Sequence, residues 1–165
     1  MNTTQLQCAM DSDPAMKEYQ RKVFALDQFK KAKLSERGIY ICNEQTSQNP
    51  GSHWFLIITE LDKVYFIDSF AQSPKYFGIE RKINKLKKSV AALSDIIQNP
   101  FSTLCGEYCL FFAYHLSRNI NLKNVINFFT SDSVRNDQNI KQFVLRKFPG
   151  HERNFTNVFW SEQNK

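Results

Sequence analysis

The segment GEYCLFFAYHL, residues 106–116, constrains the fold more than any other part of the sequence. On a helix this run is apolar on nearly all sides, which is the pattern of a helix buried in the middle of a domain. The chain has 165 residues, a normal length for one globular domain, and its 15 Phe, 6 Tyr and 2 Trp provide enough bulky apolar surface to enclose such a helix. We therefore expect a single domain, residues 1–165, built around this helix.

The apolar residues elsewhere in the chain predict both strands and helices. Residues 54–60 and 64–68 are apolar, β-branched and aromatic, and the short turn between them indicates a hairpin. A shorter β-like run covers 39–42, and 23–29 fits an extended segment as well as part of a helix. Apolar residues spaced by three and four predict further helices at 16–34, 76–93, 122–129 and 137–148.

These elements together predict an α+β fold, in which a small mixed or antiparallel β-sheet packs around the buried helix. We expect three parts within the single domain. Residues 1–37 form a helical or extended N-terminal segment, residues 38–150 form the core, and residues 151–165 form a tail.

The chain is basic, with a net charge of +6 from 22 Lys and Arg against 16 Asp and Glu. Part of the excess falls on the outer face of the predicted helix 76–93, at Arg81, Lys82, Lys85, Lys87 and Lys88. A solvated helix face is the simplest interpretation of this cluster, although a charge of this size also permits contact with nucleic acid.

Residues 1–14 contain no basic stretch followed by an apolar run, so we expect no secretory signal. The longest apolar runs, 54–58 and 110–114, are too short to cross a bilayer, and no membrane association is expected. Cys105 and Cys109 are four residues apart, which suits one helix face better than a disulfide. We therefore expect an intracellular protein in a reducing compartment, not a secreted one.

Four residues at element boundaries form a pattern typical of a cysteine nucleophile and its helpers. Cys105 comes directly before Gly106 and the buried helix, so it lies at a helix N-terminus, where free amides and the helix dipole favour the thiolate. His53 begins one strand of the hairpin and Asp68 ends the other, so the two are neighbours, and the carboxylate can orient the imidazole as a base. Gln98 offers an amide N–H that, with the backbone N–H of Cys105, can stabilise an oxyanion.

Each of these residues also has an ordinary structural interpretation. Cys105 can be a small buried hydrophobic residue, His53 an exposed loop residue, Asp68 a turn cap and Gln98 a surface side chain. The joint order of His, Asp, Gln and Cys at element boundaries is what favours a catalytic site over four separate structural roles.

The segment QNPFSTLCGEYC, residues 98–109, resembles the active-site segment of the adenovirus maturation protease, adenain, which has the pattern Q-x-P-x-S-x-x-C-G-x-x-C. Every defined position matches with identical spacing, at Gln98, Pro100, Ser102, Cys105, Gly106 and Cys109. His53-Trp54 matches the family's His-Trp pair, and residues 64–73 match the region of its acidic residue. Asp68 falls where adenain has Glu, and Asp is the usual residue in the related SUMO-deconjugating proteases. The resemblance covers about residues 38–150.

The resemblance implies a cysteine endopeptidase whose catalytic residues are Cys105, His53, Asp68 and Gln98. Family substrates carry small residues, notably Gly, at the cleavage site, and Trp54 and Gly106 are expected to contact the substrate. Viral members of the family, and those of virus-like transposons, process capsid or core proteins. We therefore expect a protein or polyprotein substrate, a monomeric enzyme, and a location in the host nucleus, the cytoplasm or a virion.

The segment between Asp68 and Gln98 departs from adenain because it is shorter and contains no cysteine. Adenain uses a cysteine there to tether an activating peptide by a disulfide, so no covalently bound cofactor is expected here. Adenain is also stimulated by DNA through a basic surface. This leaves DNA, or a non-covalent peptide, open as an activator, with DNA contacts expected at Arg81, Lys82, Lys85 and Lys88.

The main alternative is a ubiquitin-like-protein deconjugase of the SUMO-protease type, but the Pro-x-Ser inside 98–109 favours the viral-type branch. A non-catalytic binding module would be expected to lack one of the four catalytic residues, and all are present. A basic DNA-binding protein has only the charge in its favour, without a helix-turn-helix or zinc-finger pattern. A zinc site of Cys105, Cys109 and His115 lacks a visible fourth ligand and would consume the nucleophile, so no metal is expected.

Overall fold

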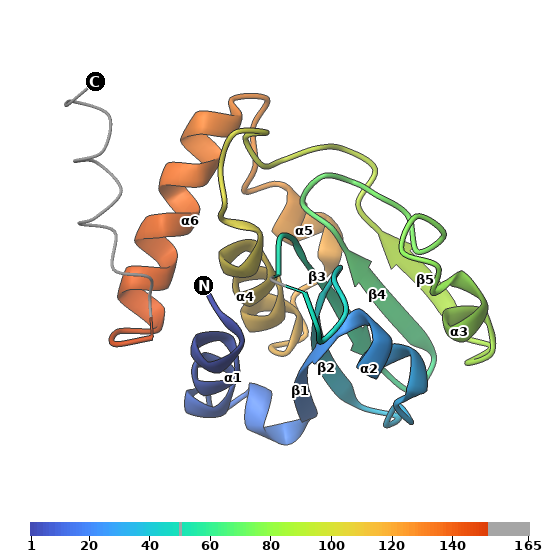
Figure 1. Cartoon of the computed structure of the whole chain (residues 1–165). Helices are drawn as coiled ribbons and strands as arrows, with labels where there is room; N and C mark the ends of the chain where they lie inside the picture. The colour runs from blue at the N-terminus through green and yellow to red at the C-terminus, as the bar shows by residue number, and fades with distance from the viewer. Residues whose placement is uncertain (50, 152–165) are drawn as a thin grey trace.

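The computed structural model describes residues 1–49 and 51–151. A five-stranded mixed sheet forms its centre, with the strands in sequence order across the sheet (Figure 1). The three middle strands are antiparallel to one another, whereas each edge strand is parallel to its neighbour. The strands are β1 (Gln20–Ala25), β2 (Gly38–Asn43), β3 (Trp54–Thr59), β4 (Lys63–Ile67) and β5 (Ser89–Ala92).

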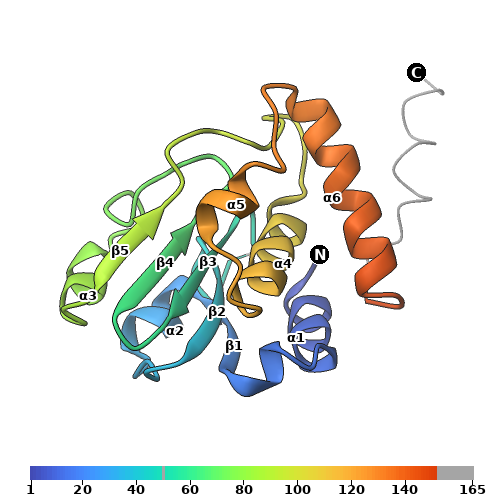
Figure 2. The ribbon, with the colours of Figure 1, turned by 180° about the vertical axis from the view of Figure 1, so that it is seen from behind.

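Helices cover both faces of the sheet, which confirms the predicted α+β class (Figures 1 and 2). One face carries α1 (Thr3–Ser12), α4 (Cys105–Leu116), α5 (Leu122–Ile126) and α6 (Ser133–Lys147). The other face carries α2 (Leu26–Lys31) and α3 (Glu80–Asn84). A short 3-10 helix, Met16–Glu18, connects α1 to the sheet.

The central strand β3 contributes side chains to both layers, because successive residues of a strand point to opposite faces. Leu56 and Ile58 join the core under α4, while Phe55 and Ile57 join the second core with the Phe77 ring. This explains why the predicted strand 54–60 is apolar throughout instead of alternating with polar residues. The hairpin expected from the sequence is confirmed, with Leu56 paired to Ile67.

The helix predicted at 106–116 is confirmed as α4, and every residue in it except Tyr114 is buried. It packs against β3 on one side and α6 on the other, and α1 and α5 complete its surroundings. Its first residue is Cys105. The apolar core therefore fixes the position of the helix end at which the predicted nucleophile lies.

The helix predicted at 76–93 is wrong over most of its length. Only α3 is helical, and residues 89–92 form the edge strand β5 alongside β4. The backbone turns left-handed at Gly78 (φ 65°) and at Lys87 (φ 54°), which ends the helix on both sides. Apolar spacing alone could not reveal that an edge of the sheet was free to pair with this segment.

The helix predicted at 16–34 is correct only around α2. Residues 20–25 form β1, whose hydrogen bonds with β2 outweigh the helical spacing of its apolar residues, so the extended interpretation of this region was closer. The sequence did not predict α1.

The helices predicted at 122–129 and 137–148 are present as α5 and α6. Helix α6 begins earlier than predicted, at Ser133, because the Asp132 side chain caps it by accepting a hydrogen bond from the backbone N–H of Arg135.

Within residues 1–49 and 51–151, no helix is long and apolar enough to cross a membrane. The predicted tail, 151–165, lies outside the described residues apart from His151. The strand predicted at 39–42 is the middle part of β2, all of whose residues are buried.

Candidate active site

His53 and Asp68 meet at one end of the β3–β4 hairpin. His53 directly precedes β3 and Asp68 directly follows β4, so the antiparallel pairing of the two strands brings both residues to the same edge. His53 Nε2 lies 2.9 Å from Asp68 Oδ2, and the two side chains are almost completely buried. The adjacency expected from the sequence is therefore present in the structure.

Both partners of this pair are held in place by further contacts. Asp68 Oδ1 accepts a hydrogen bond of 2.7 Å from the backbone N–H of Phe70. The imidazole of His53 lies between the Phe70 and Phe77 rings, with centroid distances of 5.2 and 6.2 Å. Because the ring and the carboxylate are both constrained, the imidazole keeps one orientation, with Nε2 facing Asp68 and Nδ1 directed away from it.

Cys105 begins α4 and forms a hydrogen bond with His53. Burial disfavours the charged imidazolium, but its hydrogen bonds to Asp68 and Cys105, together with the charges of these two groups, outweigh burial and raise the pKa of His53 to about 10. His53 is therefore protonated at neutral pH. The charged ring therefore lies beside the Cys105 sulfur, at the N-terminus of α4.

Gln98 is fully buried just behind these residues, with its side-chain amide bonded at both ends. Its Oε1 accepts a hydrogen bond of 2.6 Å from the Ser69 hydroxyl. Its Nε2 donates to Ser102, at 3.1 Å to the carbonyl oxygen and 3.0 Å to the hydroxyl. The amide N–H groups therefore point toward the loop that leads into Cys105.

A cleft of about 280 Å³ opens over Cys105. Its lining includes Cys105, His53 and Gln98, whereas Asp68 lies behind the imidazole and does not reach it. Phe70, Tyr76 and Pro100 form apolar parts of the wall, and Ser102 and Thr103 add hydroxyl groups. The cleft therefore places a sulfur, an imidazolium and an amide donor around one space.

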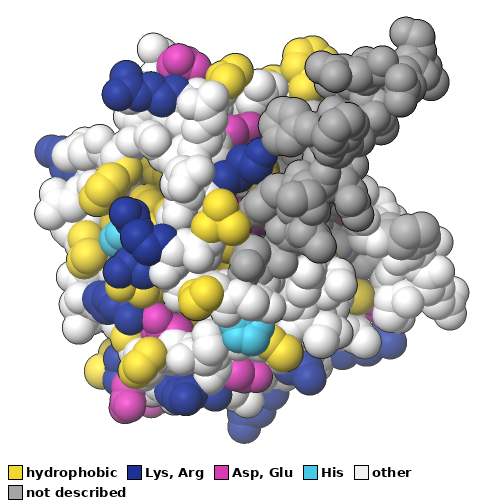
Figure 3. All heavy atoms as spheres, turned by 90° about the vertical axis from the view of Figure 1, so that its left-hand side faces the viewer, with side chains coloured by type: hydrophobic (Ala, Val, Ile, Leu, Met, Phe, Trp, Pro, Cys, Tyr) yellow, Lys and Arg dark blue, Asp and Glu magenta, His cyan; other side chains and the backbone are white. Residues whose placement is uncertain are grey.

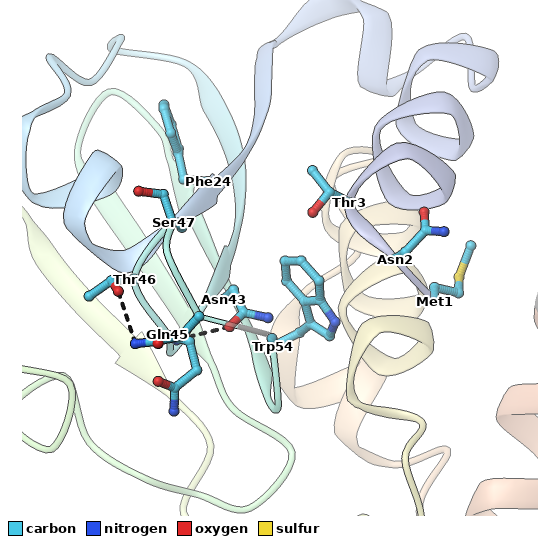
Figure 4. A pocket seen from close by; sticks show the side chains of 12 residues that line it. Met1, Asn2, Thr3, Phe24, Asn43, Gln45, Thr46, Ser47 and Trp54 are labelled. Atoms are coloured by element: carbon cyan, nitrogen blue, oxygen red, sulfur yellow. Dashed lines mark hydrogen bonds between the residues drawn. The ribbon is translucent and has the colours of Figure 1, made fainter.

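Trp54 and Gly106, the predicted substrate contacts, lie against each other. A Cβ atom on Gly106 would come within 3.4 Å of Trp54 Cδ1 and 3.3 Å of the Leu6 side chain, so a larger residue would crowd both. Trp54 does not line the cleft over Cys105. It lines a neighbouring cavity of about 270 Å³, where Figure 4 shows its indole between the start of α1 and Asn43.

The four basic residues predicted to contact DNA do not lie on one helix face. Arg81 and Lys82 belong to α3, Lys85 follows it, and Lys88 lies in the turn before β5. Two of the ammonium groups bind backbone carbonyls: that of Lys82 binds Lys30 and Ala32, and that of Lys88 binds Glu60. On the α6 side of the molecule, Lys and Arg side chains are scattered among other types (Figure 3).

The residues of the zinc alternative are separated by their contacts. Cys109 is buried, and burial, followed by nearby negative groups, raises the pKa of its thiol well above the ordinary value. His115 bonds through Nδ1 to the carbonyl oxygen of Phe111, at 2.8 Å, among aromatic rings. Across the described part of the chain, no three His, Cys, Asp or Glu side chains gather closely enough to hold a metal ion.

Ser69 is the site residue that the sequence analysis missed. It is buried and bonds Gln98 through both its backbone and its hydroxyl. Its position directly after Asp68 was the only available signal. A contact between residues 69 and 98 depends on how two distant segments pack, which neither periodicity nor a motif reveals.

Comparison with known proteins places this geometry on a recognised fold. No protein-family profile and no curated protein matches the sequence. The ASFV pS273R protease superposes with a TM-score of 0.59 at 14% identity, over 84% of this chain and 65% of that one. ChlaDub1 from Chlamydia trachomatis superposes with a TM-score of 0.50 at 17% identity, over 70% of this chain and 60% of that one.

This chain has the fold of a known protease. The fold predicted from the resemblance is therefore confirmed, at a level of identity that establishes the fold alone. The chain spans 60% and 65% of the lengths of the two solved structures. Its activity, substrate and partners therefore have to follow from the chemistry of its own site.

Proposed function

We propose that this chain is a cysteine endopeptidase with Cys105 as nucleophile, His53 as acid and base, Asp68 as the orienting carboxylate and Gln98 as an oxyanion donor. The observation that carries the proposal is the His53–Asp68 contact of 2.9 Å beside a cysteine at the first position of a buried helix. This arrangement places Cys105, His53 and Gln98 around one cleft, with Asp68 behind His53, and so supplies each group that thiol proteolysis requires. The protease fold of the ASFV pS273R structure supports the same conclusion.

In the proposed reaction, the Cys105 thiolate attacks the scissile carbonyl carbon, and the π electron pair of the carbonyl moves to its oxygen. The backbone N–H of Cys105 and the side-chain amide of Gln98 stabilise this oxyanion. The Ser102 hydroxyl, which now accepts from Gln98 Nε2, is the acceptor that the oxyanion would replace. The His53 imidazolium then gives its proton to the leaving nitrogen as the C–N bond breaks.

The resulting thioester between Cys105 and the acyl part of the substrate is hydrolysed in the second half of the reaction. A water molecule attacks the thioester carbonyl while His53, now neutral, takes one of its protons. Collapse of the second tetrahedral intermediate breaks the C–S bond, releases a carboxylic acid and restores the thiolate–imidazolium pair.

The proposed substrates are proteins cleaved at Gly-containing sites during maturation of viral or virus-like particles, acted on by a monomeric enzyme. This part of the proposal is supported by the match of residues 98–109 to the adenain pattern. The side chains around Cys105 include the bulky Phe70 and Tyr76, which leave most room for a residue without a side chain. Activation by DNA through the basic residues of α3 and the turn after it is part of the same proposal.

Alkylation by iodoacetamide tests the nucleophile directly. Cys8 is exposed, whereas Cys42, Cys105 and Cys109 are buried, so accessibility alone predicts labelling of Cys8 first. Burial raises the pKa of both Cys42 and Cys109, and they should remain unlabelled. We expect Cys105 to react first at neutral pH, ahead of Cys8, because only Cys105 has an imidazolium partner.

The same samples are then assayed for cleavage of Gly-containing peptides, with and without added DNA. Cys105→Ala should lose all activity, and Cys109→Ala, on the same helix, is the matched control that should keep it. Labelling of Cys8 ahead of Cys105, with no cleavage under either condition, would contradict the proposed function.

Substrate type is decided with a panel that sets Gly-containing peptides against a fusion to a ubiquitin-like protein. Cleavage of the peptides at comparable or higher kcat/KM supports an endopeptidase. Cleavage of the fusion alone would support the deconjugase that the sequence left as the alternative.

A further inference from the structure

Ser69 connects the two halves of the proposed site. It follows Asp68 directly and is 3% exposed. Its carbonyl oxygen accepts hydrogen bonds from the backbone N–H groups of Ile97, at 3.0 Å, and Gln98, at 3.3 Å. Its hydroxyl lies 2.6 Å from Gln98 Oε1. One residue therefore bonds both the main chain and the side chain of the oxyanion donor, while its neighbour in the chain orients the histidine.

The chemistry of the partners determines which way the Gln98 amide faces. The carbonyl oxygen of Ser102 can only accept a hydrogen bond, so the amide atom 3.1 Å from it must be the nitrogen. The amide oxygen then faces Ser69, and the Ser69 hydroxyl must donate to it. Rotation of the amide by half a turn would place its oxygen against the Ser102 carbonyl and turn the N–H groups away from the cleft.

The backbone around Gln98 is held independently of the Ser69 hydroxyl. The carbonyl oxygen of Ile97 accepts from Asn136 Nδ2 at 2.9 Å, and the backbone N–H of Asn99 donates to Asp137 at 3.4 Å. The start of α6 thus fixes the residues on either side of Gln98. Removing the Ser69 hydroxyl would therefore leave the main chain in place and free the oxygen end of the Gln98 amide, which would then be held only through Nε2 at Ser102.

We propose that Ser69 is a positioning residue that holds the Gln98 amide with its N–H groups toward the substrate oxygen. Ser69 touches no reacting atom and acts through Gln98. The inference rests on the proposed function, because an oxyanion donor matters only to a chain that forms an oxyanion. It predicts that a hydroxyl group, not merely a small side chain, is required at position 69.

Steady-state kinetics on a Gly-containing peptide provide the first test. Ser69→Ala should lower kcat about 10-fold with little change in KM, because the missing hydrogen bond orients a group that acts in the transition state. Ser69→Thr keeps the hydroxyl and should recover most of the loss. Ser117→Ala, which removes a buried hydroxyl from the far end of α4, is the matched control and should leave kcat unchanged.

Two inhibitors separate positioning from general damage to the site. A peptide aldehyde forms a C–S bond with Cys105 and places the former carbonyl electrons on an oxyanion, whereas iodoacetamide alkylates the sulfur without forming one. Ser69→Ala should bind the aldehyde about 10-fold more weakly and react with iodoacetamide at the wild-type rate. In a Gln98→Ala background, Ser69→Ala should have no further effect on kcat.

Three outcomes would overturn the inference. The first is wild-type kcat in Ser69→Ala, the second is an equal loss in both inhibitor reactions, and the third is an additive loss in the double variant. In each of these the wild-type enzyme is active and the proposed function stands. A wild-type chain that neither cleaves peptides nor binds the aldehyde would contradict the proposed function and this inference together.

Discussion

Two regions of the molecule carry the charged and polar residues to which the sequence analysis assigns a function. They differ in burial, since one is enclosed and the other faces solvent. The first is the proposed catalytic site, called the catalytic corner below. It consists of His53, Asp68, Ser69, Gln98 and Cys105, all buried and each hydrogen-bonded to another member of the group. The basic corner, residues 80–88, runs along one edge of the sheet, and its positive groups are partly or fully exposed.

The difference shows how burial determines what a polar residue can do. In the catalytic corner, the side chains are buried and each group has a fixed partner, so each charge acts strongly on its neighbour. In the basic corner, water and salt screen the charges, and each one contributes little by itself. We therefore expect single substitutions to abolish function in the first corner and to adjust it in the second.

The largest effect is expected for His53→Ala. Without the imidazolium, the thiolate of Cys105 loses its partner and the leaving nitrogen loses its proton donor. We expect kcat/KM to fall on the order of 10⁴-fold or more, as for removal of a base from other nucleophilic triads. Peptide cleavage measures the loss, and the rate of iodoacetamide labelling at Cys105 should fall as well. His151→Ala, at the end of the described residues, is the control and should remain active.

Gln98→Ala should have the next largest effect, because it removes one oxyanion donor and leaves the nucleophile and its base intact. We expect kcat to fall about 10²-fold to 10³-fold, the usual result of losing one such donor. Iodoacetamide labelling at Cys105 should keep its wild-type rate, since alkylation forms no oxyanion. Gln142→Ala, on the exposed side of α6, is the matched control. A normal kcat in Gln98→Ala would show that Gln98 is not an oxyanion donor.

The pH dependence of kcat/KM should show the coupling inside the catalytic corner. Burial lowers the pKa of His53, but the hydrogen bonds that its imidazolium donates to Asp68 and Cys105 raise this pKa to about 10. A raised pKa keeps the imidazolium charged as pH increases, so activity should persist above neutral pH and fall as pH passes through about 10. Asp68→Asn removes the largest of the contributions that raise the pKa.

We therefore expect the alkaline limb of Asp68→Asn to move to lower pH by about one unit or more. At pH 9 a shift of one unit would leave the variant at about half of its own maximum, whereas the wild type would keep about nine tenths of its own. Profiles of kcat/KM from pH 5 to 11 measure the shift. An alkaline limb at the same pH in both enzymes would mean that the carboxylate does not set the protonation of His53.

The two corners also differ in how much of them could be predicted from the sequence. His53, Asp68 and Cys105 lie at the ends of elements that are apolar enough to be recognised, and strand pairing alone brings the first two together. Helix α4 is identifiable because it is apolar all round. Local patterns were sufficient here because the site occupies the boundaries of the strongest patterns in the chain.

The basic corner was misread because its local pattern is ambiguous. Ile79, Ile83 and Leu86 have helical spacing, and this spacing continues into the residues of β5. Residues 89–92 nevertheless form a strand, because they pair with β4. Strand β1 was misread for the same reason, since its partner β2 lies many residues away. Ser69 was missed because its contact with Gln98 joins segments that only tertiary packing brings together.

The smallest effects are expected in the basic corner, where the four predicted DNA contacts fall into two pairs. Arg81 and Lys85 are exposed, whereas the ammonium groups of Lys82 and Lys88 bind backbone carbonyls of α2 and the β3–β4 turn. The double variant Arg81→Ala/Lys85→Ala should cleave peptides within about 2-fold of wild type in the absence of DNA. With DNA, its cleavage rate should be stimulated less than that of the wild type. The slope of the logarithm of its DNA affinity against the logarithm of the salt concentration should fall by about one for each phosphate that is no longer bound.

Lys82→Ala serves as the comparison, because its side chain connects α3 to α2. It should lower the Tm by about 2–4 °C, and the exposed pair should not change the Tm. The measurements are peptide cleavage over a range of salt concentrations, with and without duplex DNA, and thermal unfolding. Identical rates and salt dependence with and without DNA in the wild type would remove DNA as an activator. The exposed charges of the basic corner would then serve only to solvate this edge of the sheet.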